Sequence, residues 1–177
     1  MQNNTEYEIK ILNVDVNELR GKLLANGFKE KPRVLFKRRV YELDDGAWLR
    51  LRTDGKKTTL TYKKSHGNAI DGMEEVETEV SDFEATHQIL VKAGIVAKNY
   101  QENYRTEFRN DEVEVTIDEW PKIPPYAEIE GTSVKVVEKY LRQLDLQDYQ
   151  TTSKPTSHVY ELANIDIAAI NQLTFED

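Results

Sequence analysis

The chain contains no cysteine among its 177 residues. Disulfide bonds and thiolate metal ligands are therefore excluded, and the absence is typical of proteins in a reducing compartment. No apolar run approaches the roughly 20 residues that a membrane span needs. The first five residues are polar and lack the apolar core of a secretory signal. We therefore expect a cytoplasmic protein that does not bind membranes.

Positive charge is in the minority. The chain has 24 lysines and arginines against 32 aspartates and glutamates, which gives a net charge of -8. This balance argues against a general nucleic-acid binder. A glycine-rich loop of the P-loop type is also missing, so a P-loop nucleotide site is excluded. The length is sufficient for one domain with a sizeable core, and we expect residues 1–177 to form a single domain.

Charge alternates with apolar character in the segment 6–10, whose sequence is EYEIK. In a β-strand, alternate side chains point to opposite faces of the sheet. Glu6, Glu8 and Lys10 would then share one face, while Tyr7 and Ile9 share the other. A single strand of this kind is ordinarily the wet face of a sheet. A functional interpretation therefore depends on whether other strands repeat the pattern.

Other segments do repeat the alternation. Strands are expected over 34–43, 47–53, 57–64, 75–80, 97–108, 113–120 and 127–130. Helices are expected after Asp15, after a capping box that starts at Ser81, and after Ser133, with a further short helix over 165–173 and irregular chain over 151–157. About eight strands joined by tight turns can close into a barrel without edges. The sequence thus predicts an α+β fold, a closed eight-stranded antiparallel β-barrel with helices packed outside and a charged tunnel inside.

Such a tunnel would contain charges of both signs. The candidate basic residues are Lys10, Arg50, Arg52, Lys63 and Arg105, with Arg39 if its strand register permits, and the candidate acids are Glu6, Glu8, Glu77, Asp118, Glu128 and Glu130. Crowded like charges are unfavourable unless a ligand neutralises them. Arginine binds phosphate oxygens with two parallel hydrogen bonds, and carboxylates bind Mg²⁺ or Mn²⁺. The pattern predicts a site for a polyphosphate with a divalent metal.

The joint pattern resembles the CYTH superfamily, also called the triphosphate tunnel metalloenzymes. The resemblance rests on Glu-x-Glu-x-Lys at 6–10, Leu-Arg-Leu-Arg at 49–52, Lys63, Glu75 and Glu77, Arg105, Asp118, and Glu128 with Glu130, in the family's order across about residues 5–160. The family includes class IV adenylyl cyclases, thiamine triphosphatases and inorganic triphosphatases. One departure is Asn103, which stands where the family often has a lysine two residues before the arginine.

The resemblance implies roles for individual residues. It implies that Glu6, Glu8 and Glu130 bind Mg²⁺ or Mn²⁺ with support from Glu128 and Asp118, that Lys10 and Lys63 are catalytic and contact phosphate, that Arg50, Arg52 and Arg105 bind the substrate, and that Glu77 orients a basic group or the substrate. The phosphate contact that Asn103 lacks is either missing or supplied from elsewhere, with Arg39 and Arg109 as the candidates.

The implied function is that of a class IV adenylyl cyclase, which converts ATP to cyclic AMP and pyrophosphate. A triphosphatase acting on inorganic triphosphate, thiamine triphosphate or a nucleoside triphosphate is the first alternative. A non-catalytic polyphosphate or nucleotide-binding module is the second, and an acidic interaction module without a ligand is the third. The expected partner is a small-molecule triphosphate. The sequence leaves open the organic part of the substrate, the number of metals and whether the chain forms a homodimer.

Overall fold

A strongly curved sheet organises the chain. The computed structural model describes residues 7–43, 46–65 and 73–176. The strands are β1 (Tyr7–Ile11), β2 (Lys29–Glu30), β3 (Val34–Glu42), β4 (Ala47–Thr53), β5 (Thr58–Ser65), β6 (Met73–Val80), β7 (Asn99–Arg109), β8 (Val113–Glu119), β9 (Tyr126–Gly131), β10 (Thr151–Thr152) and β11 (Gln172–Leu173). The helices are α1 (Val16–Ala25), α2 (Phe83–Lys92), α3 (Val134–Gln143), α4 (Thr156–Leu162) and the 3₁₀ turn η2 (Ile167–Ala169).

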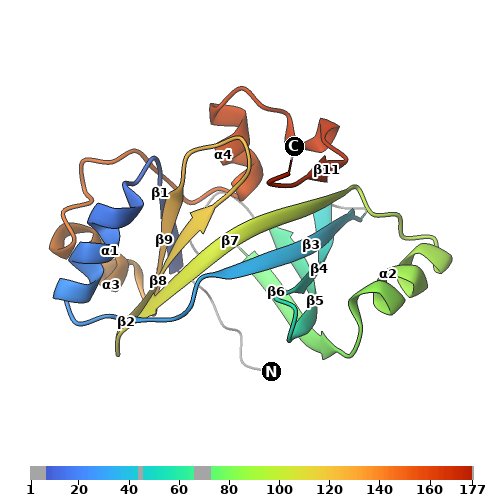
Figure 1. Cartoon of the computed structure of the whole chain (residues 1–177), viewed down its shortest axis with the longest axis horizontal. Coiled ribbons are helices and arrows are strands. Elements are labelled where there is room, and N and C mark those ends of the chain that lie inside the picture. The colour runs from blue at the N-terminus through green and yellow to red at the C-terminus, as the bar shows by residue number, and fades with distance from the viewer. Residues whose placement is uncertain (1–6, 44–45, 66–72, 177) are drawn as a thin grey trace.

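The strands follow the order β10-β1-β9-β8-β7-β3-β4-β5-β6, and neighbours in this order are antiparallel. β2 pairs antiparallel with β7, and β11 pairs parallel with it. The long strands β7 and β3 connect a group formed by β1, β9 and β8 to a group formed by β4, β5 and β6 (Figure 1).

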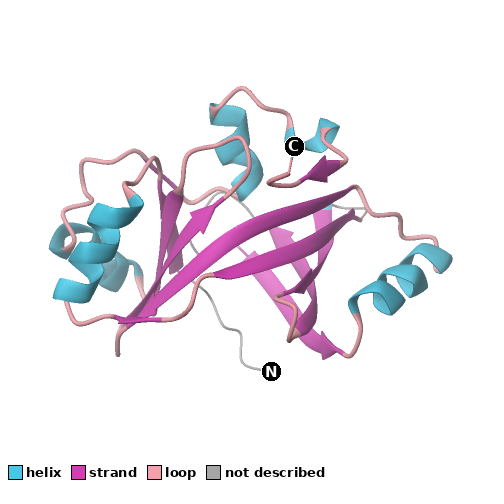
Figure 2. Ribbon diagram, viewed as in Figure 1, coloured by secondary structure: helices cyan, strands magenta, loops and turns pink. Residues whose placement is uncertain are grey.

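The predicted α+β class, an antiparallel sheet with helices packed outside, is confirmed (Figure 2). The predicted closure of eight strands is not seen. Within the described ranges the sheet has eleven strands, and its order ends at β10 and at β6 without a pairing between these two ends. The three additional strands are two residues long each, which is too short to produce an alternating pattern in the sequence.

The main core lies between α1, α3 and one face of β1, β9 and β8. It contains Ile11, Leu23, Val115, Ile129 and Val137, each at most 3% exposed. The alternation of β8 therefore has the predicted orientation, with its valines under the helices. The opposite face of the sheet carries the charged residues, and we call it the interior face. None of the helices in the described ranges has the length and apolar character to span a bilayer.

Helix caps explain where the helices begin. Asp15 accepts a hydrogen bond from the Glu18 amide and starts α1, as predicted. Ser133 does the same for α3. The predicted cap at Ser81 is wrong by one residue, because the Asp82 carboxylate accepts from the Ala85 amide and starts α2. Asp82 takes this place because a carboxylate also interacts favourably with the positive end of the helix dipole.

The C-terminal segment differs from the prediction. The helix expected over 165–173 is only the single turn η2 followed by β11, whereas α4 forms within 156–162, and β10 pairs with β1 in the segment expected to be irregular. The isoleucines at 165, 167 and 170 pack against a second core formed by Leu12, Trp120, Tyr126 and Tyr160, among others. The secondary structure of this segment is thus determined by its packing and pairing against the sheet, and the local periodicity of its sequence did not predict it.

Candidate functional site

Strand pairing brings acidic residues together on the interior face of β1 and β9. Lys10 lies directly opposite Glu128, and Glu8 lies directly opposite Glu130. Lys10 is only 3% exposed, and its Nζ lies 2.8 Å from Glu8 Oε1 and 3.2 Å from Glu128 Oε1. Burial would lower the pKa of Lys10, but Glu128 and Glu8 raise it above its ordinary value. Lys10 is therefore a stable ammonium group and unsuited to act as a general base.

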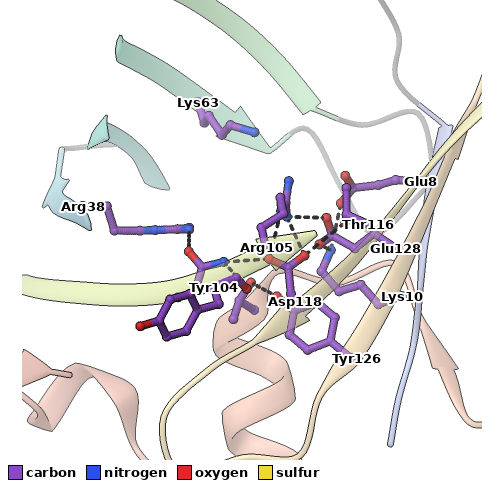
Figure 3. Close-up of polar contacts among 12 residues, drawn as sticks. Glu8, Lys10, Arg38, Lys63, Tyr104, Arg105, Thr116, Asp118, Tyr126 and Glu128 are labelled. Atoms are coloured by element: carbon purple, nitrogen blue, oxygen red, sulfur yellow. Dashed lines mark hydrogen bonds and ion pairs between the residues drawn. The ribbon is translucent and has the colours of Figure 1, made fainter. Parts of the chain in front are cut away.

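Arg105 binds two carboxylates at the centre of the interior face (Figure 3). Its Nε and Nη2 donate to Asp118 at 2.9 and 2.7 Å, and its Nη2 also donates to Glu128 at 2.8 Å. Burial alone would lower the pKa of Arg105, but Asp118 and Glu128 raise it well above its ordinary value. Burial would likewise raise the pKa of Glu128, whereas Lys10 and Arg105 lower it to about 2. Lys10, Arg105 and Glu128 therefore form a buried ionised network, while burial raises the pKa of Asp118 and Arg105 opposes this shift.

Both carboxylate oxygens of Asp118 already accept hydrogen bonds from neighbouring side chains. Besides the two bonds from Arg105, it accepts from Asn103 Nδ2 at 2.7 Å and from Thr116 Oγ1 at 3.1 Å. Its side chain is completely buried. A fully bonded carboxylate of this kind is better suited to fix Arg105 than to bind a metal ion. Asn103 thus acts here as a donor to Asp118.

Three guanidinium groups lie on the interior face of β3 and β4. Arg38 is the cross-strand partner of Arg52, and Arg50 lies on the same face of β4. Arg50 is 3.6 Å from Glu77 and 3.7 Å from Glu75. Among the described residues, neither Arg38 nor Arg52 forms a salt bridge with a carboxylate.

This basic group is only partly compensated. The Nε atoms of Arg38 and Arg50 are buried and have no hydrogen-bond partner within the described part of the chain. Burial, followed by the positive charges of Arg50 and its neighbours, lowers the pKa of Arg38 to about 9 and that of Arg52 to about 10. Burial also lowers the pKa of Arg50. For Arg38 and Arg52 the shifts indicate that the charged form lacks stabilising partners, whereas Glu75 and Glu77 partly oppose the shift of Arg50.

Lys63 and Glu77 lie beside the arginines on β5 and β6. The Nζ of Lys63 is 2.7 Å from Glu75 Oε2, and Glu77 accepts a hydrogen bond from Thr61 at 2.7 Å. Burial would raise the pKa of Glu77, but Thr61 and Arg50 lower it. The charge of Lys63 also lowers the pKa of Glu128, which belongs to the acidic group. The basic and acidic groups therefore face one another across the interior.

The placement predicted for Arg39 is wrong. Arg39 pairs with Leu51 and Tyr100, whose side chains lie on the outer face of the sheet, and its Nη2 is 3.3 Å from Glu84 of α2. Arg38 takes the interior position instead. Both faces of β3 carry basic and apolar residues, so alternation alone did not show which face is the interior face. The pairing of β3 with the Leu-Arg-Leu-Arg strand β4 shows it, because Arg38 is opposite Arg52 and Arg39 is opposite Leu51.

The proposed metal ligands have different surroundings. Glu6 lies outside the described residues, and among the residues that are described no three acidic or histidine side chains converge on one point. Glu8 and Glu130 are direct cross-strand partners on the interior face. The side chain of Glu8 is 36% exposed, and it also accepts a hydrogen bond from Lys10 Nζ at 2.8 Å. Hard divalent cations prefer such oxygen ligands.

The CYTH domain profile matches residues 4–148, and the chain therefore belongs to the CYTH family. Members of this family process triphosphates and depend on a metal. No curated protein matches the chain in sequence.

Solved structures with the same fold share little sequence with the chain. A protein from Pyrococcus horikoshii OT3 has a TM-score of 0.75 at 21% identity, covering 85% of this chain and 96% of its own. A proposed adenylate cyclase from Vibrio parahaemolyticus has a TM-score of 0.67 at 15% identity, covering 84% and 94%. A proposed adenylyl cyclase from Hippeastrum that reveals a dominant triphosphatase activity has a TM-score of 0.60 at 15% identity, covering 93% and 98%. At these identities the similarity shows the fold alone.

Proposed function

We propose that this protein is a metal-dependent enzyme that acts on a triphosphate bound at the interior face. The observation that carries the proposal is the group of buried guanidiniums on β3 and β4, which lack sufficient carboxylate partners. Burying uncompensated charge is costly, and a polyanion would remove that cost. Arginine forks match phosphate oxygens bidentately. The site is thus better suited to a polyanion than to a neutral ligand.

Residues of the acidic group would serve different purposes in this enzyme. Glu8 and Glu130, together with Glu6, would hold Mg²⁺ or Mn²⁺, and the bound metal would neutralise charge on the phosphate oxygens. Asp118 and Glu128 hold Arg105 in place. Lys10 and Lys63 contribute fixed positive charge beside the phosphates, because positioning and electrostatic stabilisation dominate phosphoryl transfer.

The reaction we propose first is that of a class IV adenylyl cyclase. The ribose 3′-hydroxyl of ATP attacks the α-phosphorus, cyclic AMP forms and pyrophosphate leaves. In the alternative, a triphosphatase, water attacks the terminal phosphorus and orthophosphate leaves. A specific observation favours retaining this alternative: a protein of the same fold, from Hippeastrum, combines a proposed cyclase function with a dominant triphosphatase activity.

The test is to incubate the protein with Mg²⁺ or Mn²⁺ and, separately, with ATP, thiamine triphosphate and inorganic triphosphate, and to resolve the products. Cyclic AMP with pyrophosphate identifies the cyclase, and orthophosphate identifies the triphosphatase. The control is Glu8→Gln, which removes one proposed metal ligand and should abolish turnover. Triphosphate binding without any turnover would reject the enzyme and leave a non-catalytic polyphosphate-binding module.

A further inference from the structure

Arg38 is a buried cation without a carboxylate partner of its own. Its side chain belongs to β3 on the interior face, and the residue is 8% exposed. Its Nη2 donates to Asn103 Oδ1, and its guanidinium stacks on the Trp120 ring at 4.5 Å from the ring centroid. Its Nε has no hydrogen-bond partner in the described structure. Neither an amide oxygen nor an aromatic face neutralises a positive charge as a carboxylate does.

Asn103 fixes one side of this guanidinium. The Asn103 amide is fully buried, and its Nδ2 donates to Asp118 Oδ1 at 2.7 Å. Because the Arg38 guanidinium can only donate hydrogen bonds, the Asn103 oxygen must face Arg38 and its amino group must face Asp118. The orientation of Arg38 is therefore linked to the Asp118–Arg105 pair.

The C-terminal segment fixes the other side. Trp120 packs edge-on against Tyr160 of α4, with ring centroids 6.2 Å apart and ring planes at 84°. Tyr160 is completely buried, and its hydroxyl donates to the Pro121 carbonyl at 2.7 Å. α4 begins at Thr156, beyond the residues that the family profile matches. A segment outside the family match thus supports the aromatic ring on which Arg38 rests.

We propose that Arg38 is a further triphosphate-binding residue of this protein, and that Asn103 and the Trp120–Tyr160 pair position it. The inference rests on the proposed function. Phosphate oxygens accept hydrogen bonds from guanidinium groups and neutralise them at the same time. A bound triphosphate would therefore satisfy the free Nε of Arg38 and relieve the repulsion among the clustered arginines.

The electrostatic surroundings of Arg38 agree with this role. Burial lowers the pKa of Arg38, and Arg50, Arg52 and Arg105 lower it further. Asp118 is the opposing influence, but its carboxylate is bound to Arg105. A bound anion would therefore stabilise the charged form of Arg38, which no carboxylate among the described residues pairs with.

The first experiment measures the affinity of inorganic triphosphate with Mg²⁺ by titration calorimetry for the wild-type chain, Arg38→Gln and Lys37→Gln. Lys37 is an exposed neighbour on the outer face of the same strand, and its substitution removes the same charge. We expect Arg38→Gln to bind about 10- to 100-fold more weakly, the effect of losing a charged hydrogen bond. We expect Lys37→Gln to bind within about twofold of the wild type.

The second experiment tests positioning with Tyr160→Phe, which removes only the hydroxyl that bonds Pro121. We expect Tyr160→Phe alone to bind triphosphate about threefold more weakly than the wild type. We expect the double variant Arg38→Gln/Tyr160→Phe to bind it as weakly as Arg38→Gln alone. Equal effects in both backgrounds would show that Tyr160 acts on general stability alone and would overturn the positioning role. Melting temperatures of all variants identify any that fail to fold.

The outcomes separate this inference from the function on which it rests. If the wild type binds triphosphate and Arg38→Gln binds it equally well, the role of Arg38 is rejected and the proposed function stands. If the wild type does not bind triphosphate at all, the proposed function itself is rejected, and the inference with it.

Discussion

Glu128 contacts two cations of the interior face at once, Lys10 and Arg105, and each of them has one further carboxylate partner among the described residues. Its folded-state pKa of about 2 lies below the ordinary value of 4.5. Glu128 therefore contributes stability above pH 4.5 that is lost as the pH falls towards 2. We expect Glu128→Gln to lower the free energy of unfolding at pH 7 by about 3 kcal/mol, because Lys10 and Arg105 each lose one of their two carboxylate partners.

Denaturant unfolding between pH 2 and pH 7 measures this effect. The loss of stability on acidification should be shallower in Glu128→Gln than in the wild type. Glu138→Gln, at an exposed position of α3, is the control and should follow the wild type within about 0.5 kcal/mol. An unchanged acid profile in Glu128→Gln would show that this carboxylate is not ionised in the folded protein.

Replacing Arg52 should stabilise the ligand-free protein but weaken triphosphate binding, whereas replacing Glu128 should destabilise the protein. Burial and the neighbouring Arg50 and Arg105 lower the pKa of Arg52 to about 10, so its charged form is less stable in the folded protein than in the unfolded one. We expect Arg52→Met to raise the free energy of unfolding of the ligand-free protein by about 1 kcal/mol and to weaken triphosphate binding by about tenfold or more.

Thermal denaturation without ligand and calorimetric titration with inorganic triphosphate measure the two effects of Arg52→Met. Lys56→Met, an exposed turn substitution, should change neither. If Arg52→Met destabilised the ligand-free protein, other residues of the fold would compensate the charge of Arg52. The inference that the arginines of β3 and β4 need a bound anion would then be wrong.

The sequence was informative about which residues share a face and less informative about what they contact. Period-two alternation correctly grouped Lys10, Arg50, Arg105, Asp118 and Glu128, because alternation is a local property of a strand. The contacts that occupy Asp118 come from three different residues and depend on the strand register. The interior position of the residue at 38 depends on register as well, and register is set by pairing between distant segments.

At the scale of elements, the long strands and the capped helices were predicted well. β4 was predicted with its observed bounds, Ala47–Thr53, because Asp54-Gly55 marks the turn that follows it. The C-terminal elements were not predicted well, because β10 and β11 each form their hydrogen bonds with a partner strand more than 70 residues away. Elements that exist only through such long-range pairing leave no local pattern.

The helix α2 should depend on its cap more than α3 does. α2 has no buried residue, whereas α3 is anchored by Val137 and Tyr140. Removing a capping side chain costs about 1 kcal/mol. Because little packing opposes that loss in α2, we expect Asp82→Ala to increase amide hydrogen exchange throughout α2, while Ser133→Ala leaves exchange in most of α3 unchanged.

Hydrogen exchange resolved by peptide tests this contrast, and each variant is the control for the other. Triphosphate binding should be unaltered in both variants, because neither cap lies on the interior face. Equal fraying of the two helices would mean that α2 is held by packing that its exposure does not reveal.

At the scale of the whole molecule, the interior is divided between two groups of strands. Glu8, Asp118 and Glu128 lie on β1, β8 and β9, and the partly compensated arginines lie on β3 and β4, with Glu75 and Glu77 of β6 beside Arg50. β7 and β3 join the two groups, while the described ends of the sheet, β10 and β6, do not pair with each other. A ligand with metal at one end and phosphate oxygens along its length would contact both groups at once.

We therefore expect inorganic triphosphate with Mg²⁺ to reduce amide hydrogen exchange in both groups of strands, in β1 and β9 as well as in β4 and β5. A ligand at a hundredfold excess over its dissociation constant stabilises the folded state by about 2.7 kcal/mol, and strands that it contacts should also open locally less often. Orthophosphate is the control, because it has a single phosphorus and fewer oxygens with which to contact both groups. Protection confined to β4 and β5 would mean that triphosphate binds only the arginines, and a site assembled from both halves of the sheet would then be wrong.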